Sequence, residues 1–278
     1  MSTASLPEAA ASSDGVTVGA TSRYFNLTRE LAVTNFKLKY TGSVLGYLWS
    51  LMKPLAYFGI LYVIFVDLFH QRGTNFPLQL FVAIVIFTFF AECTTTSLGA
   101  VAGNGHLVRK AYFPLSALVV SQSVTALMTM AINLVLIVVV ATPIGRLDLS
   151  PASLTVPLFL VELYLLSLGV GMLLGAAFVF YRDLGHVWEV FTQLLLYGCG
   201  VVFPALLVPV RVRPLFFLNP LAQIIEDVRH ALVTPDAPWT VTLVGFPQYL
   251  VPLVLSLLVF VGGLFLFRRL TPLFAENL

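Results

Sequence analysis

The sequence predicts an all-α integral membrane protein with about six transmembrane helices, and three observations support this fold class. Of the 278 residues, 59% are hydrophobic and only 10% are charged, and the mean hydropathy is +0.95. Soluble domains are about half apolar and a quarter charged. Long apolar runs recur between Leu48 and Phe267, and no polar block is long enough to enclose its own core. This pattern excludes a separate globular catalytic domain.

The chain begins with a polar stretch followed by a short amphipathic segment. Residues 1–20 are rich in Ser, Ala and Thr and lack the basic start and apolar run of a signal peptide, so we expect a disordered tail. Residues 24–40 carry apolar side chains at three-to-four-residue spacing beside Arg29, Lys37 and Lys39. This pattern predicts an amphipathic helix that lies along the membrane interface.

Six stretches are apolar and long enough to cross a bilayer, which takes roughly 20 residues. We place these spans near residues 48–69, 78–101, 113–141, 154–180, 187–208 and 249–267, within one membrane domain that covers residues 21–278. An even number of spans puts both termini on the same side of the membrane.

The distribution of Lys and Arg predicts which side this is, because cytoplasmic loops carry an excess of both residues. With the termini inside, the cytoplasmic set is Arg23, Arg29, Lys37, Lys39, Lys53, Arg109, Lys110, Arg182, Arg268 and Arg269. The smaller external set is Arg72, Arg146, Arg211, Arg213 and Arg229. We therefore expect cytoplasmic termini.

Residues 209–248 are too many for a plain turn and too apolar for a soluble loop, and prolines interrupt them repeatedly. Asn219 can cap a helix whose first position is Pro220. An apolar stripe follows, and the opposite face carries polar residues that include Arg229. We expect an interfacial or re-entrant helical segment on the extracytoplasmic side, which either caps a pathway or only anchors the protein.

Sequence signatures of enzymes and metal sites are absent. No phosphate-binding glycine-rich loop with a following Lys occurs, and no G-x-S-x-G motif is present. The four histidines lack the spacing of a metal site, and Cys93 and Cys199 are expected to be free packing thiols. We therefore expect no catalytic residue, metal or cofactor on this chain, and a net charge of +2 gives no indication of nucleic-acid binding.

Two carboxylates lie inside predicted spans, where a charge is costly unless protein or water surrounds it. For Glu92 a pathway lining and a helix contact stay open, whereas for Glu162 a helix contact is favoured. Aromatic residues crowd the first two spans, and Tyr57, Tyr62 and Phe87 are candidates to line a path with Glu92. The same residue types also serve as membrane-interface belts and packing, so both readings remain.

Short motifs occur in a fixed order along the chain. The first runs from Arg29-Glu30-Leu31 through Phe36-Lys37-Leu38-Lys39-Tyr40 and Gly42-Ser43-Val44-Leu45-Gly46 to Trp49 and Pro54. The others are Leu107-Val108-Arg109-Lys110 with Phe113-Pro114, Tyr181-Arg182-Asp183-Leu184, and Asn219-Pro220 with Arg229. In this arrangement the chain resembles the permease subunits of ATP-binding-cassette (ABC) exporters for lipid-linked polysaccharides, the O-antigen and teichoic acid type often called Wzm.

The resemblance implies a homodimer in the bacterial cytoplasmic membrane, served by two copies of a separate ATPase that uses ATP and Mg. The exported substrate would be a glycan on a polyprenyl diphosphate. Within the family the chain is most similar to mycobacterial exporters of lipid-linked galactan, a cell-wall precursor. The high Arg content relative to Lys fits a GC-rich genome.

The resemblance also suggests roles for particular residues. A gate helix over residues 24–40 would meet the diphosphate lipid, with the candidate residues Arg23, Arg29, Lys37, Lys39, Tyr40 and Trp49. The ATPase would contact His106, Arg109, Lys110, Phe113, Arg182 and Asp183. Asn219, Pro220 and Arg229 would belong to an extracytoplasmic gate. The basic residues among these also serve to orient the protein in the membrane, whatever else they do.

Two functions of other classes remain as alternatives. An integral membrane enzyme acting on a lipid-linked substrate would need a convergent acid, base or metal cluster, which the sequence does not reveal. A passive channel would leave the charged cytoplasmic segments without a partner.

Overall fold

The computed structural model describes residues 20–41, 46, 48–68, 75–105, 113–143, 147, 150–233 and 237–277. Within these residues the secondary structure is helical and no strand occurs, which confirms the predicted all-α class. The expected N-terminal tail lies almost entirely outside the described residues.

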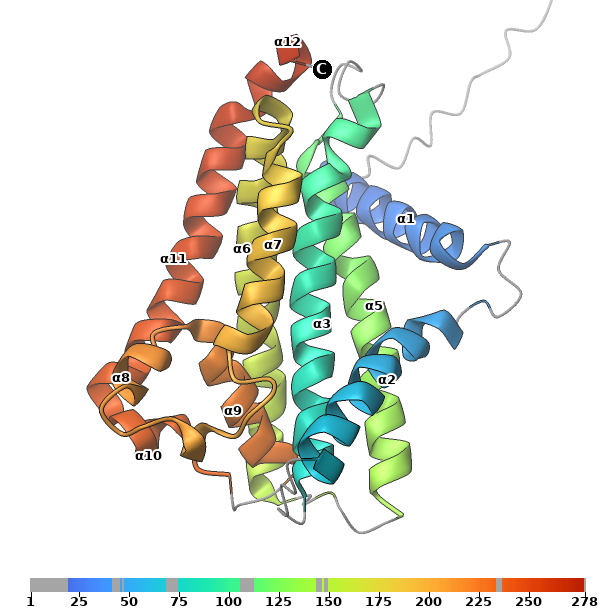
Figure 1. The fold of residues 1–278 in the computed structure, drawn as a ribbon. Helices are drawn as coiled ribbons and strands as arrows, with labels where there is room; N and C mark the ends of the chain where they lie inside the picture. The colour runs from blue at the N-terminus through green and yellow to red at the C-terminus, as the bar shows by residue number, and fades with distance from the viewer. Residues whose placement is uncertain are drawn as a thin grey trace, which may run out of the picture.

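Long apolar helices run side by side and make up the bundle, with neighbours along the chain pointing in opposite directions (Figure 1). They are α2 (Leu48–Tyr62), α3 (Phe76–Ala100), α5 (Ser116–Ala141), α6 (Val156–Phe180), α7 (Leu184–Gly198) and α11 (Phe246–Leu270). Helix α2 continues as a π-helical turn, η1 (Val63–Leu68). Among the described residues, five helices are long and apolar enough to cross a membrane: α2, α3, α5, α6 and α11, each with its helical extension where one follows or precedes it.

The fifth predicted span differs from the structure. We expected a span over residues 187–208, but α7 has only 15 residues and ends at Gly198. Gly200 then adopts φ +74°, a left-handed conformation that glycine tolerates and that ends a helix. The following residues up to Val208 are bends and the short 3₁₀ helix η4 (Ala205–Leu207). The predicted boundary was wrong because hydropathy measures composition and does not register this backbone break.

Helix α3 forms the centre of the bundle and touches α2, α5, α6, α7 and α9. Small residues on α6 permit close approach between this helix and its neighbours. A Cβ atom on Gly171 would come within 2.8 Å of Ser97 Cβ on α3, and one on Gly175 within 2.9 Å of Ser97 O. On the other side, a Cβ on Gly169 would lie 2.5 Å from Phe260 Cα on α11. Glycine is therefore required where these helices cross.

Helix α1 (Ala20–Tyr40) lies across the bundle near the end where the C-terminus is found (Figure 1). It docks on α5 through polar pairs rather than through an apolar stripe alone. Tyr24 Oη lies 3.2 Å from Ser116 Oγ, and Asn35 Nδ2 donates to Ser121 Oγ over 3.4 Å. The helix is therefore held in a defined register on the bundle.

The opposite end of the bundle holds the segment before the last long helix (Figure 1). It contains α8 (Arg213–Phe216), α9 (Pro220–Leu232) and α10 (Thr240–Val244). The helix expected at Asn219 and Pro220 is present, and Asn219 Oδ1 accepts a hydrogen bond from the Leu221 backbone N–H at 3.0 Å. Helix α9 is buried on both its apolar and its polar faces. It is thus packed inside the protein rather than lying along an interface.

Short elements complete the described chain. They are the 3₁₀ helices η2 (Ala102–Asn104), η3 (Pro151–Thr155) and η5 (Thr271–Leu273), and the final helical turn α12 (Phe274–Asn277). The two cysteines are buried and free, as expected. Glu162 on α6 accepts a hydrogen bond from Ser256 Oγ on α11 at 3.2 Å, which is the helix contact that the sequence favoured for it.

Candidate functional site

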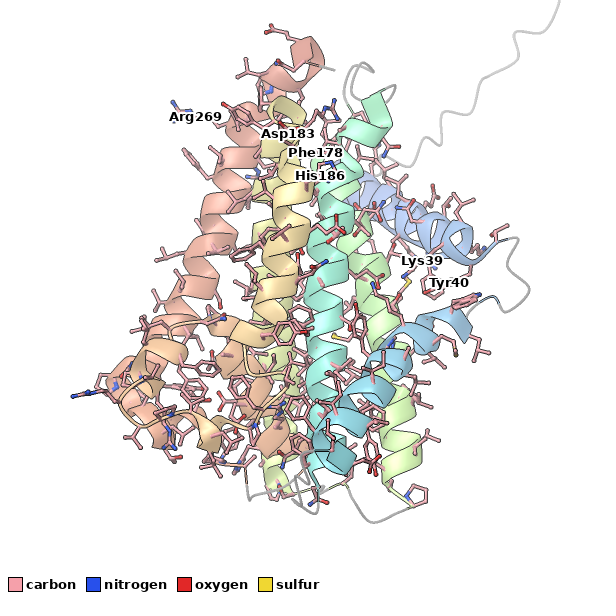
Figure 2. The ribbon with its side chains drawn as sticks, viewed as in Figure 1. Lys39, Tyr40, Phe178, Asp183, His186 and Arg269 are labelled. Carbon is pink, nitrogen blue, oxygen red and sulfur yellow. The ribbon has the colours of Figure 1, made fainter. Side chains whose placement is uncertain are left out.

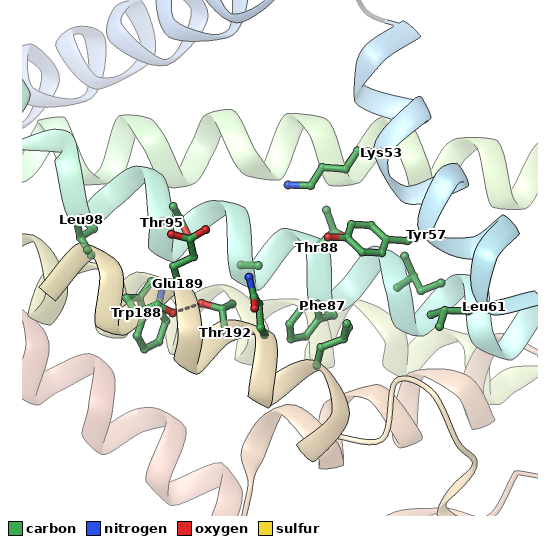
Figure 3. Close-up of a pocket in the computed structure, with 15 residues that line it drawn as sticks. Lys53, Tyr57, Leu61, Phe87, Thr88, Thr95, Leu98, Trp188, Glu189 and Thr192 are labelled. Carbon is green, nitrogen blue, oxygen red and sulfur yellow. Dashed lines mark hydrogen bonds between the residues drawn. The ribbon is translucent and has the colours of Figure 1, made fainter. Parts of the chain in front are cut away.

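A groove with a volume of about 370 Å³ lies between α2, α3 and α7 (Figure 3). On α3 it extends from Ile84 to Leu98, and 14 residues of helix rise about 21 Å. That length is roughly two thirds of the hydrocarbon thickness of a bilayer, about 30 Å. The groove therefore runs along much of the depth that a membrane would occupy.

The lining combines aromatic rings with polar side chains. Its residues are Lys53, Tyr57 and Leu61 of α2, Ile84, Phe87, Thr88, Ala91, Thr95 and Leu98 of α3, and Gly185, Trp188, Glu189, Thr192, Gln193 and Leu196 of α7. Hydroxyl, amide and charged groups in an otherwise apolar bundle would be costly if they faced lipid. The groove therefore gathers hydroxyl, amide and charged side chains in an otherwise apolar bundle.

Trp188 is held within this groove by one hydrogen bond and two aromatic contacts. Its Nε1–H donates to Thr94 Oγ1 over 3.2 Å, which ties α7 to α3. The ring stacks on Phe191 at a centroid distance of 5.3 Å and lies 6.3 Å from Phe90. Thr192 donates its hydroxyl to the Trp188 carbonyl, as Figure 3 indicates. A rigid, anchored indole of this kind is suited to stacking on a flat apolar face of a ligand.

Of the four residues considered for a path, two line the groove. Tyr57 and Phe87 contribute to it. Tyr62 instead packs against Phe58 at a centroid distance of 5.6 Å, and the Glu92 carboxylate meets Lys39 of α1 and Thr129 of α5. The sequence analysis missed the whole α7 wall. Its groove residues recur at helical spacing from Gly185 to Leu196, and this polar face on an apolar helix was the available signal.

The basic residues of α1 do not form one cluster. Arg23 and Lys39 are 16 positions apart, or about 24 Å along a helix, so they cannot hold one headgroup together. Arg23, Arg29 and Lys37 are exposed. Lys39 alone among these four has an ion pair within the described residues, to Glu92 of α3. Burial lowers the pKa of Lys39, but the nearby Glu92 carboxylate outweighs it, so the pKa lies above the usual value and the ammonium stays charged.

The other two gate-helix candidates flank the connection to α2. Tyr40 is buried at the end of α1 and packs edge to face against Phe36, 5.3 Å between centroids. Trp49, at the start of α2, is 53% exposed.

The residues expected to contact an ATPase are only partly described. His106, Arg109 and Lys110 lie outside the described residues. Phe113 is half-buried and packs on the apolar cluster at this end of the bundle. Arg182 and Asp183 are exposed in the turn between α6 and α7, and the Arg182 guanidinium lies 5.3 Å from the Phe178 ring centroid. Figure 2 shows Asp183, His186 and Arg269 at this end of the bundle.

At the other end, Arg229 of α9 is fully buried and connects three segments. Its guanidinium donates to the main-chain oxygens of Gln79, Gly200, Val201 and Phe203 and to the Glu226 carboxylate, at 2.7–3.3 Å. Burial lowers the pKa of Arg229 from its ordinary value, and burial raises that of Glu226 despite the guanidinium beside it. The residue therefore stabilises the break after α7 and the start of α3, while a direct contact with a substrate is sterically excluded.

No group of three His, Cys, Asp or Glu side chains that could hold a metal ion occurs within the part of the chain that the structure describes. The arrangement thus consists of a transmembrane groove, a docked amphipathic helix and a buried outer segment. Residues 26–233 match the profile of the ABC-2 type transporter family, which covers most of the chain. The chain belongs to this family.

Curated relatives of this ABC-2 membrane domain cover between 66% and 91% of its length. An O-antigen export system permease protein, RfbA, from Klebsiella pneumoniae is 24% identical over 91% of this chain and 95% of its own. RfbA from Myxococcus xanthus is 26% identical over 66% of this chain and 70% of its own. The polysialic acid transport protein KpsM from Escherichia coli is 24% identical over 68% of this chain and 74% of its own. The ABC-2 membrane domain is therefore a multi-pass membrane protein of a transporter.

Proposed function

We propose that this chain is the permease subunit of an exporter that moves a lipid-linked polysaccharide across the bacterial cytoplasmic membrane. The observation that carries the proposal is the near full-length similarity to permeases named for O-antigen export. The aromatic and polar groove agrees with it, because anchored aromatic rings and hydroxyl or amide groups are the side chains that contact sugar rings.

The groove requires a second wall, and a second copy of this chain is the proposed source. Of the most apolar 18 residues of α2 with η1, only 6% are buried in the chain, whereas the corresponding share for α3 with η2 is 67%. Glu189 and Gln193 of α7 are exposed beside the groove. Polar groups at membrane depth need cover from protein or water. Two chains that face each other across their grooves would enclose a path and meet this need.

The lipid end of the substrate is proposed to be a polyprenyl diphosphate that approaches along α1. Arg23, Arg29 and Lys37 are exposed on this helix and offer positive charge along its length. Lys and Arg attract phosphate electrostatically and through charge-assisted hydrogen bonds. Because these cations are spread over about 21 Å of helix, they provide a row of separate contacts rather than one binding site. A galactan-like cell-wall glycan is the proposed cargo.

A separate ATPase, which would bind ATP and Mg, is proposed to act on the end of the bundle where α1 and the C-terminus lie. Arg182 and Asp183 are exposed there at the start of α7, so movement of this turn would pass directly into a wall of the groove. The termini are proposed to be cytoplasmic, because this end carries basic residues such as Arg182 and Arg269.

Groove variants test the proposal in cells. Cells in which the native gene is replaced by one that encodes the Trp188→Ala variant should export less glycan, because the anchored ring is lost. Lipid-linked glycan should then accumulate inside these cells. Tyr197→Ala is the matched control, since Tyr197 lies on α7, is 62% exposed and does not line the groove. Normal export in the Trp188 variant, with normal amounts of protein, would remove the groove from the pathway.

A further inference from the structure

Three helices meet at one charged side chain, Lys39, which contacts Glu92 on a face of α3 next to the one that lines the groove. Lys39 Nζ at the end of α1 lies 2.5 Å from Glu92 Oε1 of α3 and 3.3 Å from Thr129 Oγ1 of α5. The Tyr40 ring centroid is 5.3 Å from the same nitrogen. Figure 2 shows Lys39 and Tyr40 at the end of α1 that approaches the start of α2. The contact joins residues 53 positions apart.

The two charges differ in their access to the surroundings. The Lys39 side chain is 36% exposed, whereas that of Glu92 is 16% exposed. An anion from outside can therefore reach the Lys39 ammonium without first displacing protein. It then lies close to the less exposed Glu92 carboxylate.

Glu92 has little room to withdraw from such an anion. The cavity beside it, lined partly by Thr129 and Asn133, has a volume of about 10 Å³. This is the space of about one water molecule. An anion that binds Lys39 therefore remains close to the carboxylate and is repelled by it, and this repulsion is strong where water is scarce.

Glu92 neutralises Lys39 with a single negative charge. A phosphodiester lipid also offers one negative charge, so it gains little by competing with Glu92 and meets its repulsion. A diphosphate carries more charge on more oxygen atoms, so it can outweigh Glu92 at the ammonium. The exposed cations Arg23, Arg29 and Lys37 have no such carboxylate within the described residues and attract any anionic lipid.

From this geometry we propose that the Glu92 carboxylate repels weakly charged anions from Lys39. The end of α1 then accepts a diphosphate headgroup and rejects lipids with a single phosphate. This inference rests on the proposed function, because it names how the same protein selects its substrate. The pair is a specificity filter, and the remaining cations of α1 supply attraction without discrimination.

Lipid binding to the purified permease with its ATPase, followed by native mass spectrometry, tests the filter. The probes are phosphatidylglycerol and a polyprenyl diphosphate without sugar. Glu92→Gln keeps an oxygen that can accept from Lys39 and removes the charge. We expect phosphatidylglycerol to bind this variant about tenfold more tightly, the scale of one like charge removed from a partly exposed site. The affinity for the diphosphate lipid should change less, so the preference for the diphosphate lipid over phosphatidylglycerol becomes smaller.

Matched variants separate the filter from a general effect of charge. Glu30→Gln removes an exposed carboxylate from α1 and should leave the preference between the two lipids unchanged. Lys39→Gln should abolish the preference, and Lys39→Gln with Glu92→Gln should show no gain in phosphatidylglycerol binding. An unchanged lipid preference in Glu92→Gln would overturn the proposal.

A charge-exchange variant and a competition experiment complete the test. If Glu92→Gln fails to fold, the exchange Lys39→Glu with Glu92→Lys retains the ion pair and places the cation at the less exposed position. Weaker diphosphate binding is then expected, and an unaltered preference contradicts the filter. Inorganic diphosphate should compete poorly because it lacks lipid chains, and strong competition would reassign the site to a soluble diphosphate. Absence of glycan export with an intact lipid preference would count against the proposed function alone.

Discussion

Arg229 on α9 donates a hydrogen bond to the main-chain oxygen of Gln79, 150 positions earlier in the chain, at a distance of 3.1 Å. Through the same guanidinium it holds the carbonyls of Gly200, Val201 and Phe203, where the chain leaves α7. The outer end of the groove therefore depends on one side chain that itself contacts no part of the groove.

Arg229→Met should destabilise the protein strongly. The change leaves four carbonyls and the Glu226 carboxylate without their donor, and loss of one partner of a buried charged pair costs about 3–5 kcal/mol. Thermal unfolding of the detergent-solubilised protein measures the loss. Arg211→Met is the matched control, because Arg211 is exposed on the same side. Equal melting temperatures for the two variants would contradict the role assigned to Arg229.

Two adjacent glycines of α11 should respond differently to alanine. A Cβ on Gly263 would lie 2.4 Å from the Gly169 carbonyl oxygen of α6, whereas one on Gly262 would meet nothing within 4 Å. Gly263→Ala must push the two helices apart, and overpacking of this kind costs about 1–3 kcal/mol. Gly262→Ala should be neutral. Melting temperatures of the two variants compare them directly, and a neutral Gly263→Ala would mean that the helices are less closely packed than described.

Asp227 of α9 should make stability depend on pH. Burial raises its pKa above 3.8, although Gln223 and the Thr240 backbone N–H, which donates at 2.8 Å, oppose this effect. The folded state thus retains a proton that the unfolded state releases, so the contribution of Asp227 to stability is largest below pH 3.8 and is lost as pH rises through the folded pKa. Asp227→Asn should flatten this fall. Unfolding followed from pH 4 to pH 7 measures the slope, and identical slopes in both proteins would show that Asp227 does not titrate between those limits.

The sequence was sufficient where local patterns determine structure. Asn219 and Pro220 predicted the start of α9, and the position of Glu162 within an apolar span indicated a helix contact. Apolar runs located the long helices because each exceeds the length that a membrane crossing needs.

Long-range relationships were beyond such patterns. Glu92 was recognised as a residue that needed a partner, but Lys39 lies 53 positions away on a helix that crosses the bundle, and no periodicity connects them. The end of α7 was missed because Gly198, Cys199 and Gly200 stand within an apolar run. The groove emerged only when Tyr57, Phe87 and Trp188 from three helices were brought together.

The most direct test of the account is to purify the tagged chain from its native host in a mild detergent and identify the proteins and lipids that accompany it by mass spectrometry. The account predicts a nucleotide-binding subunit in equal amount together with a polyprenyl diphosphate that carries a glycan. Recovery of this chain without an ATPase under several mild conditions would contradict the proposed exporter.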